Sequence, residues 1–145
     1  MLTIQLNELP LRTTWTAKVP NQRAHSTFPF LLAQENENIS LVYVELNPGD
    51  QLGTHTDSAE EVLFIFEGSV EVTVGDEKAV VEAPALALVP TMVPHNLENV
   101  GETRAKVAGF FPSRNIVATF DNAWLPDDSN VVDTAQIAEF MAQQT

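Results

Sequence analysis

From Ile39 onward the sequence alternates short apolar runs with turn-forming residues at intervals of roughly eight to twelve positions. The clearest case is the segment 70–74, where three valines alternate with Glu71 and Thr73, so that one face of a strand is apolar and the other polar. Gly75-Asp76-Glu77 follows as a hairpin turn into the next apolar run. Several short strands at this spacing predict an all-β sandwich or barrel. A chain of 145 residues suits a single domain.

Two histidines and two carboxylates are spaced so that a closed barrel would gather them. His55 and Asp57 are two residues apart, so on a strand their side chains project from the same face. Glu61 follows a predicted turn at Ser58-Ala59, and His95 lies on a different hairpin. Imidazole and carboxylate groups are ligands for several divalent metals, and two facing carboxylates repel each other unless a cation neutralises them. The spacing therefore indicates a candidate metal site.

The residues around these side chains resemble the two sequence motifs of the cupin superfamily. The first motif is matched by Gly49, His55, Glu61 and Gly68, with Asp57 where the pattern has a second histidine. The second motif is matched by Pro90, His95 and Asn99, whereas Pro84 and Met92 stand where the pattern has glycines. The match includes three of the four usual metal-binding positions of that family.

This resemblance implies a cupin-like double-stranded β-helix, or jelly-roll, barrel. It also implies one divalent metal ion (Fe, Mn, Ni or Zn) held by His55, Glu61 and His95, with Asp57 as the fourth ligand. Because Asp57 departs from the family pattern, three roles stay open for it. It is an oxygen ligand, an acceptor that orients His55 or a bound water, or a turn residue with no part in binding.

The resemblance implies a metal-dependent protein that binds or acts on a small molecule inside the barrel. Dioxygenase, isomerase and lyase chemistry all occur among such proteins, and the alternative is a non-catalytic binding or sensing module. A third interpretation is a 2-oxoglutarate-dependent Fe(II) oxygenase that uses His55, Asp57 and His95. That interpretation needs a basic residue in the pocket, and strand alternation predicts that Arg104 and Lys106 point to solvent instead.

The chain divides into three predicted parts of one domain. Residues 1–38 are expected to be extended segments that pack on the barrel, and residues 39–112 form its core. Residues 113–145 are expected to be a connector followed by a short helix, since the segment 112–130 is rich in Pro, Asp and Asn. Asp133 and Gln136 have the spacing of a capping box, and apolar side chains from Ile137 onward predict a helix that docks on the sheet.

Composition limits the partners and the location. The formal net charge of −13 and seven scattered basic residues argue against a nucleic-acid surface, and no apolar stretch is long enough for a bilayer. The chain has no cysteine and no signal-peptide pattern, so we expect a soluble, cytoplasmic protein. Val62–Phe66 is apolar on both faces, so the terminal segments or a second subunit must cover the outer one, and we expect a homodimer. His25 is expected to be a surface or lid residue.

Overall fold

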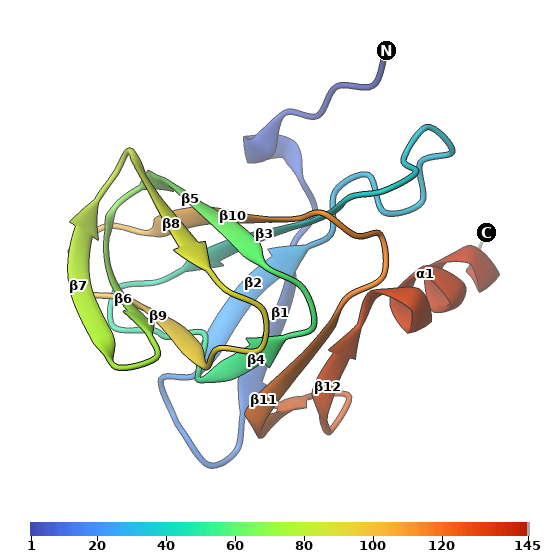
Figure 1. Ribbon diagram of the computed structural model, residues 1–145. Coiled ribbons are helices and arrows are strands. Elements are labelled where there is room, and N and C mark those ends of the chain that lie inside the picture. The colour runs from blue at the N-terminus through green and yellow to red at the C-terminus, as the bar shows by residue number, and fades with distance from the viewer. Residues whose placement is uncertain (145) are drawn as a thin grey trace.

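A computed structural model gives the fold, and residues 1–144 are described (Figure 1). Twelve β-strands and one α-helix follow a short 3₁₀ helix, η1 (Leu6–Glu8). The first six strands are β1 (Arg12–Thr16), β2 (Arg23–Thr27), β3 (Ser40–Leu46), β4 (His55–Asp57), β5 (Glu61–Glu67) and β6 (Ser69–Val74). The remaining elements are β7 (Glu77–Glu82), β8 (Ala85–Val89), β9 (His95–Asn99), β10 (Ala105–Phe111), β11 (Val117–Leu125), β12 (Ser129–Asp133) and α1 (Thr134–Gln143).

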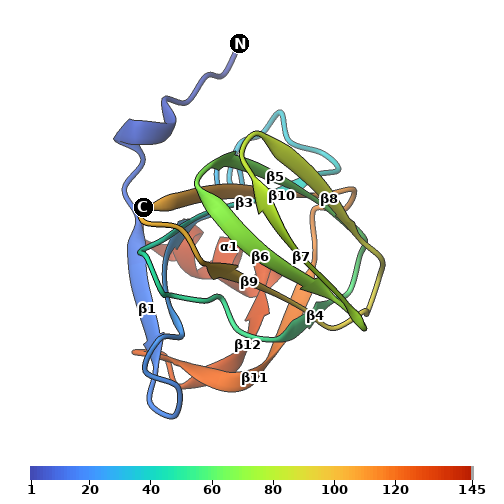
Figure 2. The ribbon, with the colours of Figure 1, turned by 90° about the vertical axis from the view of Figure 1, so that its left-hand side faces the viewer.

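The strands form one curled antiparallel sheet that nearly closes into a barrel (Figure 2). The order across the sheet is β7-β6-β9-β4-β11-β1-β2-β3-β10-β5-β8, and β12 pairs with β11. Neighbours in space are often far apart in the chain, because β4 lies between β9 and β11 and β10 lies between β3 and β5. This arrangement confirms the predicted all-β, cupin-like jelly-roll barrel with a short C-terminal helix.

The β6–β7 hairpin shows how local sequence produces this architecture. Val70 and Val72 are buried, whereas the intervening Glu71 and Thr73 are partly exposed, as the alternation predicts. Val74 pairs directly with Glu77, so the loop contains only Gly75 and Asp76. Gly75 has a φ of +58°, a left-handed conformation that a residue without a Cβ adopts at little cost.

The inward-facing side chains of β3 and β10 divide the barrel into a filled end and a hollow end. Leu46 pairs with Ala105 at the filled end, where both side chains are fully buried. One step along, Val44 pairs with Val107, and both line the cavity. The last step pairs Val42 with Gly109, which also border the cavity. The paired side chains thus become smaller along these two strands, which leaves one end of the barrel hollow.

The connector predicted for residues 112–130 is wrong, because most of that segment is strand. β11 pairs with β4 on one side and β1 on the other, so it closes the barrel. Ala118 and Phe120 are buried, whereas Thr119 and Asp121 between them are exposed. The polar residues that suggested a loop are thus the outward face of a strand and its turn into β12. Thr145, the end of the predicted 113–145 part, lies outside the described residues.

The N-terminal segments are extended, and they are integral to the sheet. β1 lies between β11 and β2, and β2 pairs with β3. His25 is on β2 rather than in an irregular segment, and its Nδ1 lies 2.7 Å from Thr13 Oγ1 in a hydrogen bond. His25 is partly exposed, as expected of a surface residue, but it is no lid residue, because strand pairing with β1 and β3 fixes it in the sheet.

The C-terminal helix begins where its capping residue predicts. The Asp133 carboxylate accepts a hydrogen bond of 2.9 Å from the Ala135 N–H, whereas Gln136 makes no returning bond within residues 1–144. Ile137 is half-buried, but Phe140 is 63% exposed although it lines the cavity. The helix lies across the open end of the barrel (Figure 1). None of the described helices is long and apolar enough to cross a bilayer.

The outer face formed by β8, β5 and β10 carries a row of exposed apolar side chains. Val62 pairs with Leu88 on one side and Phe110 on the other, so the three lie next to one another across the strands. They are 40%, 61% and 42% exposed, respectively. Phe110 thus belongs to this outer face rather than to the core. Within residues 1–144, the terminal segments leave the row uncovered.

A homodimer through this row stays a prediction, and Leu88→Glu tests it. A charge in the middle of an apolar interface disrupts association, so the variant is expected to give the monomer mass in light scattering at micromolar concentration, where the unaltered protein gives twice that mass. Val80→Glu is the control, because Val80 is equally exposed but lies on β7, away from the row. A monomeric unaltered protein contradicts the prediction.

Candidate metal centre

Two paired strands bring the two motif histidines face to face. His55 begins β4 and His95 begins β9, and these two residues are direct cross-strand partners. Their ring centroids are 4.0 Å apart. Asp57 follows on the same face of β4, and Glu61 begins β5 after a three-residue connection. All four side chains are buried, with exposures of 5%, 3%, 4% and 2% for residues 55, 57, 61 and 95.

Backbone carbonyls fix the orientation of both rings. His55 Nδ1 lies 2.8 Å from the Gly53 carbonyl oxygen, and His95 Nδ1 lies 2.9 Å from that of Val93. Because a carbonyl oxygen can only accept, each Nδ1 carries the proton and each Nε2 is left as the free nitrogen. Phe120 stacks on the His55 ring at 4.3 Å and limits its rotation. Both imidazoles are therefore oriented so that the lone pair of Nε2, the atom that could bind a metal ion, faces a common point.

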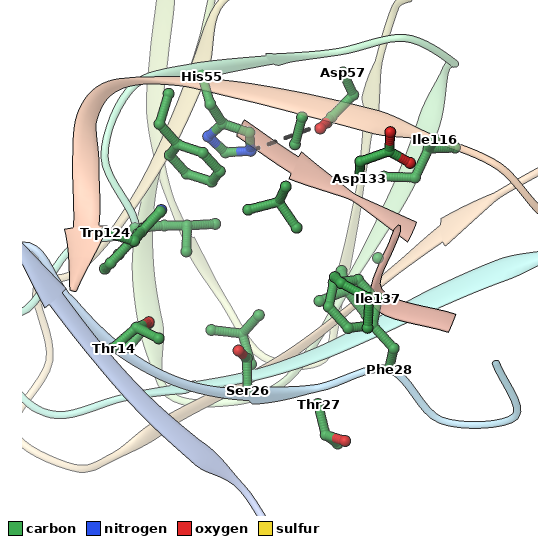
Figure 3. Close-up of a pocket in the computed structure, with 18 of the residues that line it drawn as sticks. Thr14, Ser26, Thr27, Phe28, His55, Asp57, Ile116, Trp124, Asp133 and Ile137 are labelled. Carbon is green, nitrogen blue, oxygen red and sulfur yellow. Dashed lines mark ion pairs between the residues drawn. The ribbon is translucent and has the colours of Figure 1, made fainter. Parts of the chain in front are cut away.

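The carboxylates complete a set of donor atoms around that point. Asp57 Oδ2 lies 2.9 Å from His95 Nε2. It lies 3.9 Å from His55 Nε2, the contact drawn as a dashed line in Figure 3. Glu61 Oε1 lies 3.4 Å from His95 Nε2. Within residues 1–144, Asp57 Oδ2, Glu61 Oε1 and His95 Nε2 are buried without a partner in hydrogen-bonding geometry. Buried polar atoms are nearly always satisfied, so this convergence fits a cation.

The four predicted ligands are brought together, but not equally. Ligand atoms of His55, Asp57 and His95 all lie within 4.8 Å of one another, whereas Glu61 stands beside this triad and meets it through His95. The Glu61 carboxylate occupies space that exists because residue 109 is glycine. A Cβ on Gly109 would collide with Glu61 Oε2. Gly109 thus positions the Glu61 carboxylate.

Burial and the facing charges shift the proton affinities of the group. Burial, followed by the nearby His95, lowers the pKa of His55 to about 4. Burial by itself would lower the pKa of His95, but the carboxylates of Asp57 and Glu61 outweigh it and raise that pKa to about 10. Burial raises the pKa of Glu61 to about 7, against the opposing effect of His95. In the metal-free site a proton on His95 takes the place of a cation.

Two asparagines stabilise the loops around the site. Asn99 is buried, its Nδ2 donates to the carbonyls of Leu46 and Thr103, and its Oδ1 accepts from the Gly101 N–H. It therefore secures the β9–β10 turn and is no ligand. Asn96 Oδ1 accepts from the Gly53 N–H at 2.8 Å, which holds the loop whose carbonyl orients His55.

The basic residues that a 2-oxoglutarate-dependent oxygenase would need lie outside the cavity. Arg104 Nε contacts Glu45 Oε1 at 2.6 Å, and Lys106 Nζ lies 3.6 Å from Glu67 Oε2. The alternate residues of β10, Val107 and Gly109, face inward, as the strand pattern predicts. The structure therefore offers neither base for a ligand carboxylate beside the metal centre.

A cavity of about 840 Å³ extends from the metal centre to the open end of the barrel. Its wall includes Trp124 from β11, Thr14 from β1 and Ser26 from β2, none of which the sequence singled out (Figure 3). The alternation of β11 could have identified Trp124 as inward-facing. No sequence signal marks Thr14 or Ser26, because their inward direction depends on how β1 and β2 join the barrel.

Comparisons with known proteins agree with this geometry. A sequence profile described as a cupin domain matches residues 42–111, and no curated protein matches the chain. A recombinant oxalate oxidase in complex with glycolate superimposes with a TM-score of 0.63 and 23% identity, over 71% of this chain and 57% of that one. The chain thus spans a little over half the length of that relative.

Two further solved structures are similar. The cupin domain of Schizosaccharomyces pombe Cnp3 has a TM-score of 0.63 and 16% identity, over 77% of this chain and 74% of that one. A Bacillus subtilis oxalate decarboxylase studied for its Mn(II) centres has a TM-score of 0.58 and 16% identity, over 69% of this chain and 28% of that one. At these identities the likeness concerns the fold. The profile match, the two motifs and the barrel together show that this chain belongs to the cupin superfamily.

Proposed function

We propose that this protein binds one divalent transition-metal ion through His55, Asp57, Glu61 and His95, and that it binds or converts a small molecule in the adjoining cavity. The observation that carries the proposal is the set of three buried, unpartnered polar atoms that point at one another. Fe, Mn, Ni and Zn all suit two imidazoles and two carboxylates. A likeness in fold to a decarboxylase with Mn(II) centres supports the same class of ion.

The cost of the metal-free arrangement supports a bound cation. Asp57 and Glu61 are both almost fully buried, and removing a carboxylate from water is costly unless a positive charge or donors compensate it. One proton on His95 compensates a single negative charge. A divalent cation compensates both carboxylates and satisfies the free imidazole nitrogens at the same time.

The residues divide the work of such a site. The carbonyls of Gly53 and Val93 keep both imidazoles in the Nε2-donor form, and the apolar wall excludes water from the ligand atoms. When bound, the metal would supply Lewis-acid or redox chemistry to a small anionic or enolisable ligand. Asp57 and Glu61 place negative charge beside that ligand and would offset the positive charge of the ion. Dioxygenase, isomerase and lyase reactions all fit this division.

A non-catalytic binding or sensing module is the alternative, and the cavity itself supports it. Few charged groups line the wall, and those outside the metal centre are engaged with one another or with the backbone. Elemental analysis of untagged protein, followed by oxygen-uptake screening of small acids and phenols, separates the two classes. Tightly held redox metal with substrate-dependent oxygen uptake favours an enzyme. We also retain the homodimer and a cytoplasmic location as proposals.

Removing one ligand at a time is expected to abolish stoichiometric metal. His95→Ala deletes a donor and leaves two carboxylates facing each other, so metal affinity should fall by more than the roughly 10- to 100-fold typical of changes to residues that only orient ligands. Elemental analysis after dialysis gives the readout. His25→Ala is the matched control, because His25 lies on β2 and hydrogen-bonds Thr13 outside the site. Full metal retention by His95→Ala contradicts the site.

Metal titrations of two Asp57 variants test whether Asp57 takes part in metal binding. Asp57→Asn keeps the shape but removes the charge, and a ligand role predicts weaker binding of Mn(II), Ni(II) and Zn(II) in isothermal titration. Asp57→His restores the commoner family residue and should move preference toward Ni(II) and Zn(II), which favour imidazole. Identical isotherms for all three proteins would leave Asp57 a turn residue.

Gly109→Ala is expected to weaken metal binding without contact between residue 109 and the metal. The added Cβ would displace the Glu61 carboxylate, and loss of such orientation costs roughly 10- to 100-fold in affinity. Isothermal titration measures the affinity, and circular dichroism confirms that the barrel is intact. Ala118→Gly on the facing strand is the control for altering one methyl of the cavity wall. Unchanged affinity in Gly109→Ala would exclude Glu61 as a ligand.

Metal affinity should keep rising with pH above 7. The pKa of His95 is raised to about 10 in the metal-free site, so its proton is still present at pH 7 to 8 and must leave before the metal binds. Each displaced proton makes affinity rise roughly tenfold per pH unit. His55, whose pKa is lowered to about 4, is already neutral there and adds nothing. Titrations in buffers of different ionisation enthalpy count the released protons; a plateau at pH 7 contradicts the coupling.

A further inference from the structure

Away from the metal centre the cavity is wide and mostly apolar. Its volume of about 840 Å³ falls within the range of roughly 300–1,000 Å³ that holds drug-sized ligands. The wall consists mainly of aliphatic and aromatic side chains, among them Val44, Leu63, Leu97, Val107, Phe120 and Trp124. Such a wall gains free energy by burying a hydrocarbon skeleton, and a two-carbon acid would leave most of it uncovered.

The cavity has no free positive charge for a second anionic group. Among the described lining residues outside the metal centre, Arg12 is the only cation. Both of its terminal nitrogens are paired with the Asp127 carboxylate, at 2.8 and 2.7 Å. Asp133, the other charged lining residue, is engaged in capping α1.

The charges of the metal centre also disfavour a ligand with two anionic groups. Asp57 and Glu61 together cancel the formal charge of a divalent ion. A ligand that binds as a monoanion therefore leaves one negative charge in the cavity, whereas a dianion leaves two. The second charge would lie against apolar walls without a compensating donor, which is costly.

Donors in the wall without a partner within residues 1–144 mark where a second polar group can lie. The hydroxyls of Thr14 and Ser26 make no hydrogen bond to any residue in the range 1–144, and neither does the indole N–H of Trp124. Thr14 and Ser26 lie across the cavity from His55 and Asp57 (Figure 3). A neutral hydroxyl or carbonyl at the far end of a ligand would meet them.

We propose that the ligand of this cavity is a mostly apolar, ring-sized molecule with a single acidic oxygen group toward the metal and a neutral hydrogen-bonding group toward Thr14 and Ser26. Short dicarboxylates such as oxalate are poor ligands for the same site. The inference rests on the proposed metal centre. It adds the size, charge and polarity pattern of the ligand, which the fold shared with oxalate-binding enzymes does not provide.

Three probes with one ring and one head group test this pattern. Benzoate, 4-hydroxybenzoate and terephthalate differ only at the position opposite the carboxylate, which carries a hydrogen, a hydroxyl or a second charge. Isothermal titration of metal-loaded protein should show 4-hydroxybenzoate binding roughly 2- to 10-fold more tightly than benzoate, the worth of one hydrogen bond. Terephthalate and oxalate should bind at least roughly 10-fold more weakly than benzoate.

Two variants test which residues contact the end of the ligand that points away from the metal. Thr14→Val and Ser26→Ala remove a hydroxyl with little change of shape, and together they should abolish the advantage of 4-hydroxybenzoate while leaving benzoate binding unchanged. Thr119→Val is the matched control, because Thr119 is an exposed residue of β11 between two cavity-lining neighbours. Retention of the hydroxyl advantage in the double variant overturns the assignment of Thr14 and Ser26.

The metal content of each sample separates the two levels of the proposal. A protein that takes up no metal from a Mn(II), Ni(II) or Zn(II) titration overturns the proposed function and this inference together. A metal-loaded protein that binds terephthalate or oxalate as tightly as benzoate overturns this inference alone. The expected order, 4-hydroxybenzoate, benzoate, then both dianions, supports it.

Discussion

The structure depends on how two buried carboxylates are tolerated inside an apolar barrel. Asp57 and Glu61 lie within contact distance of the same imidazole nitrogen, and both are almost inaccessible to water. Such a pair is stable only with positive charge between its members, which explains why the two carboxylates, against the opposing effect of burial, hold the pKa of His95 far above that of a free imidazole. A metal ion supplies the same compensation more completely. Because removing two carboxylates from water is costly, the stability of this end of the barrel depends on the positive charge that lies between them.

The barrel provides for that centre by a change of side-chain volume along its strands. Leu46 and Ala105 fill one end, and the pairing of Val42 with Gly109 leaves room at the other. The glycine has a second effect, because its missing Cβ is the space that the Glu61 carboxylate enters. One residue thus widens the cavity and positions the Glu61 carboxylate. The missing Cβ of Gly109 therefore determines both the width of the barrel at this end and the position of the carboxylate.

Asp57 distinguishes the candidate metal centre of this chain from the usual cupin pattern. A carboxylate in place of the family's second histidine adds negative charge, so a divalent ion held here is formally neutralised before any ligand arrives. Its Lewis acidity is then lower than in a site with three imidazoles. The surrounding wall offers no second free cation within the described residues. The two carboxylates neutralise a divalent ion, and the wall around it is apolar. Both features therefore favour a ligand that carries little charge.

The sequence by itself determined the features that depend on near neighbours in the chain. Strand alternation placed His55 and Asp57 on one face, the Gly75-Asp76 turn joined β6 to β7, and Asp133 capped α1, since each depends on backbone geometry over a few residues. Motif spacing identified Glu61 and His95. Only the tertiary structure decided that His55 pairs directly with His95, that β11 closes the barrel, and that Thr14 and Ser26 face the metal centre. These features arise from pairing between strands distant in sequence, and their register is set by closure of the whole sheet.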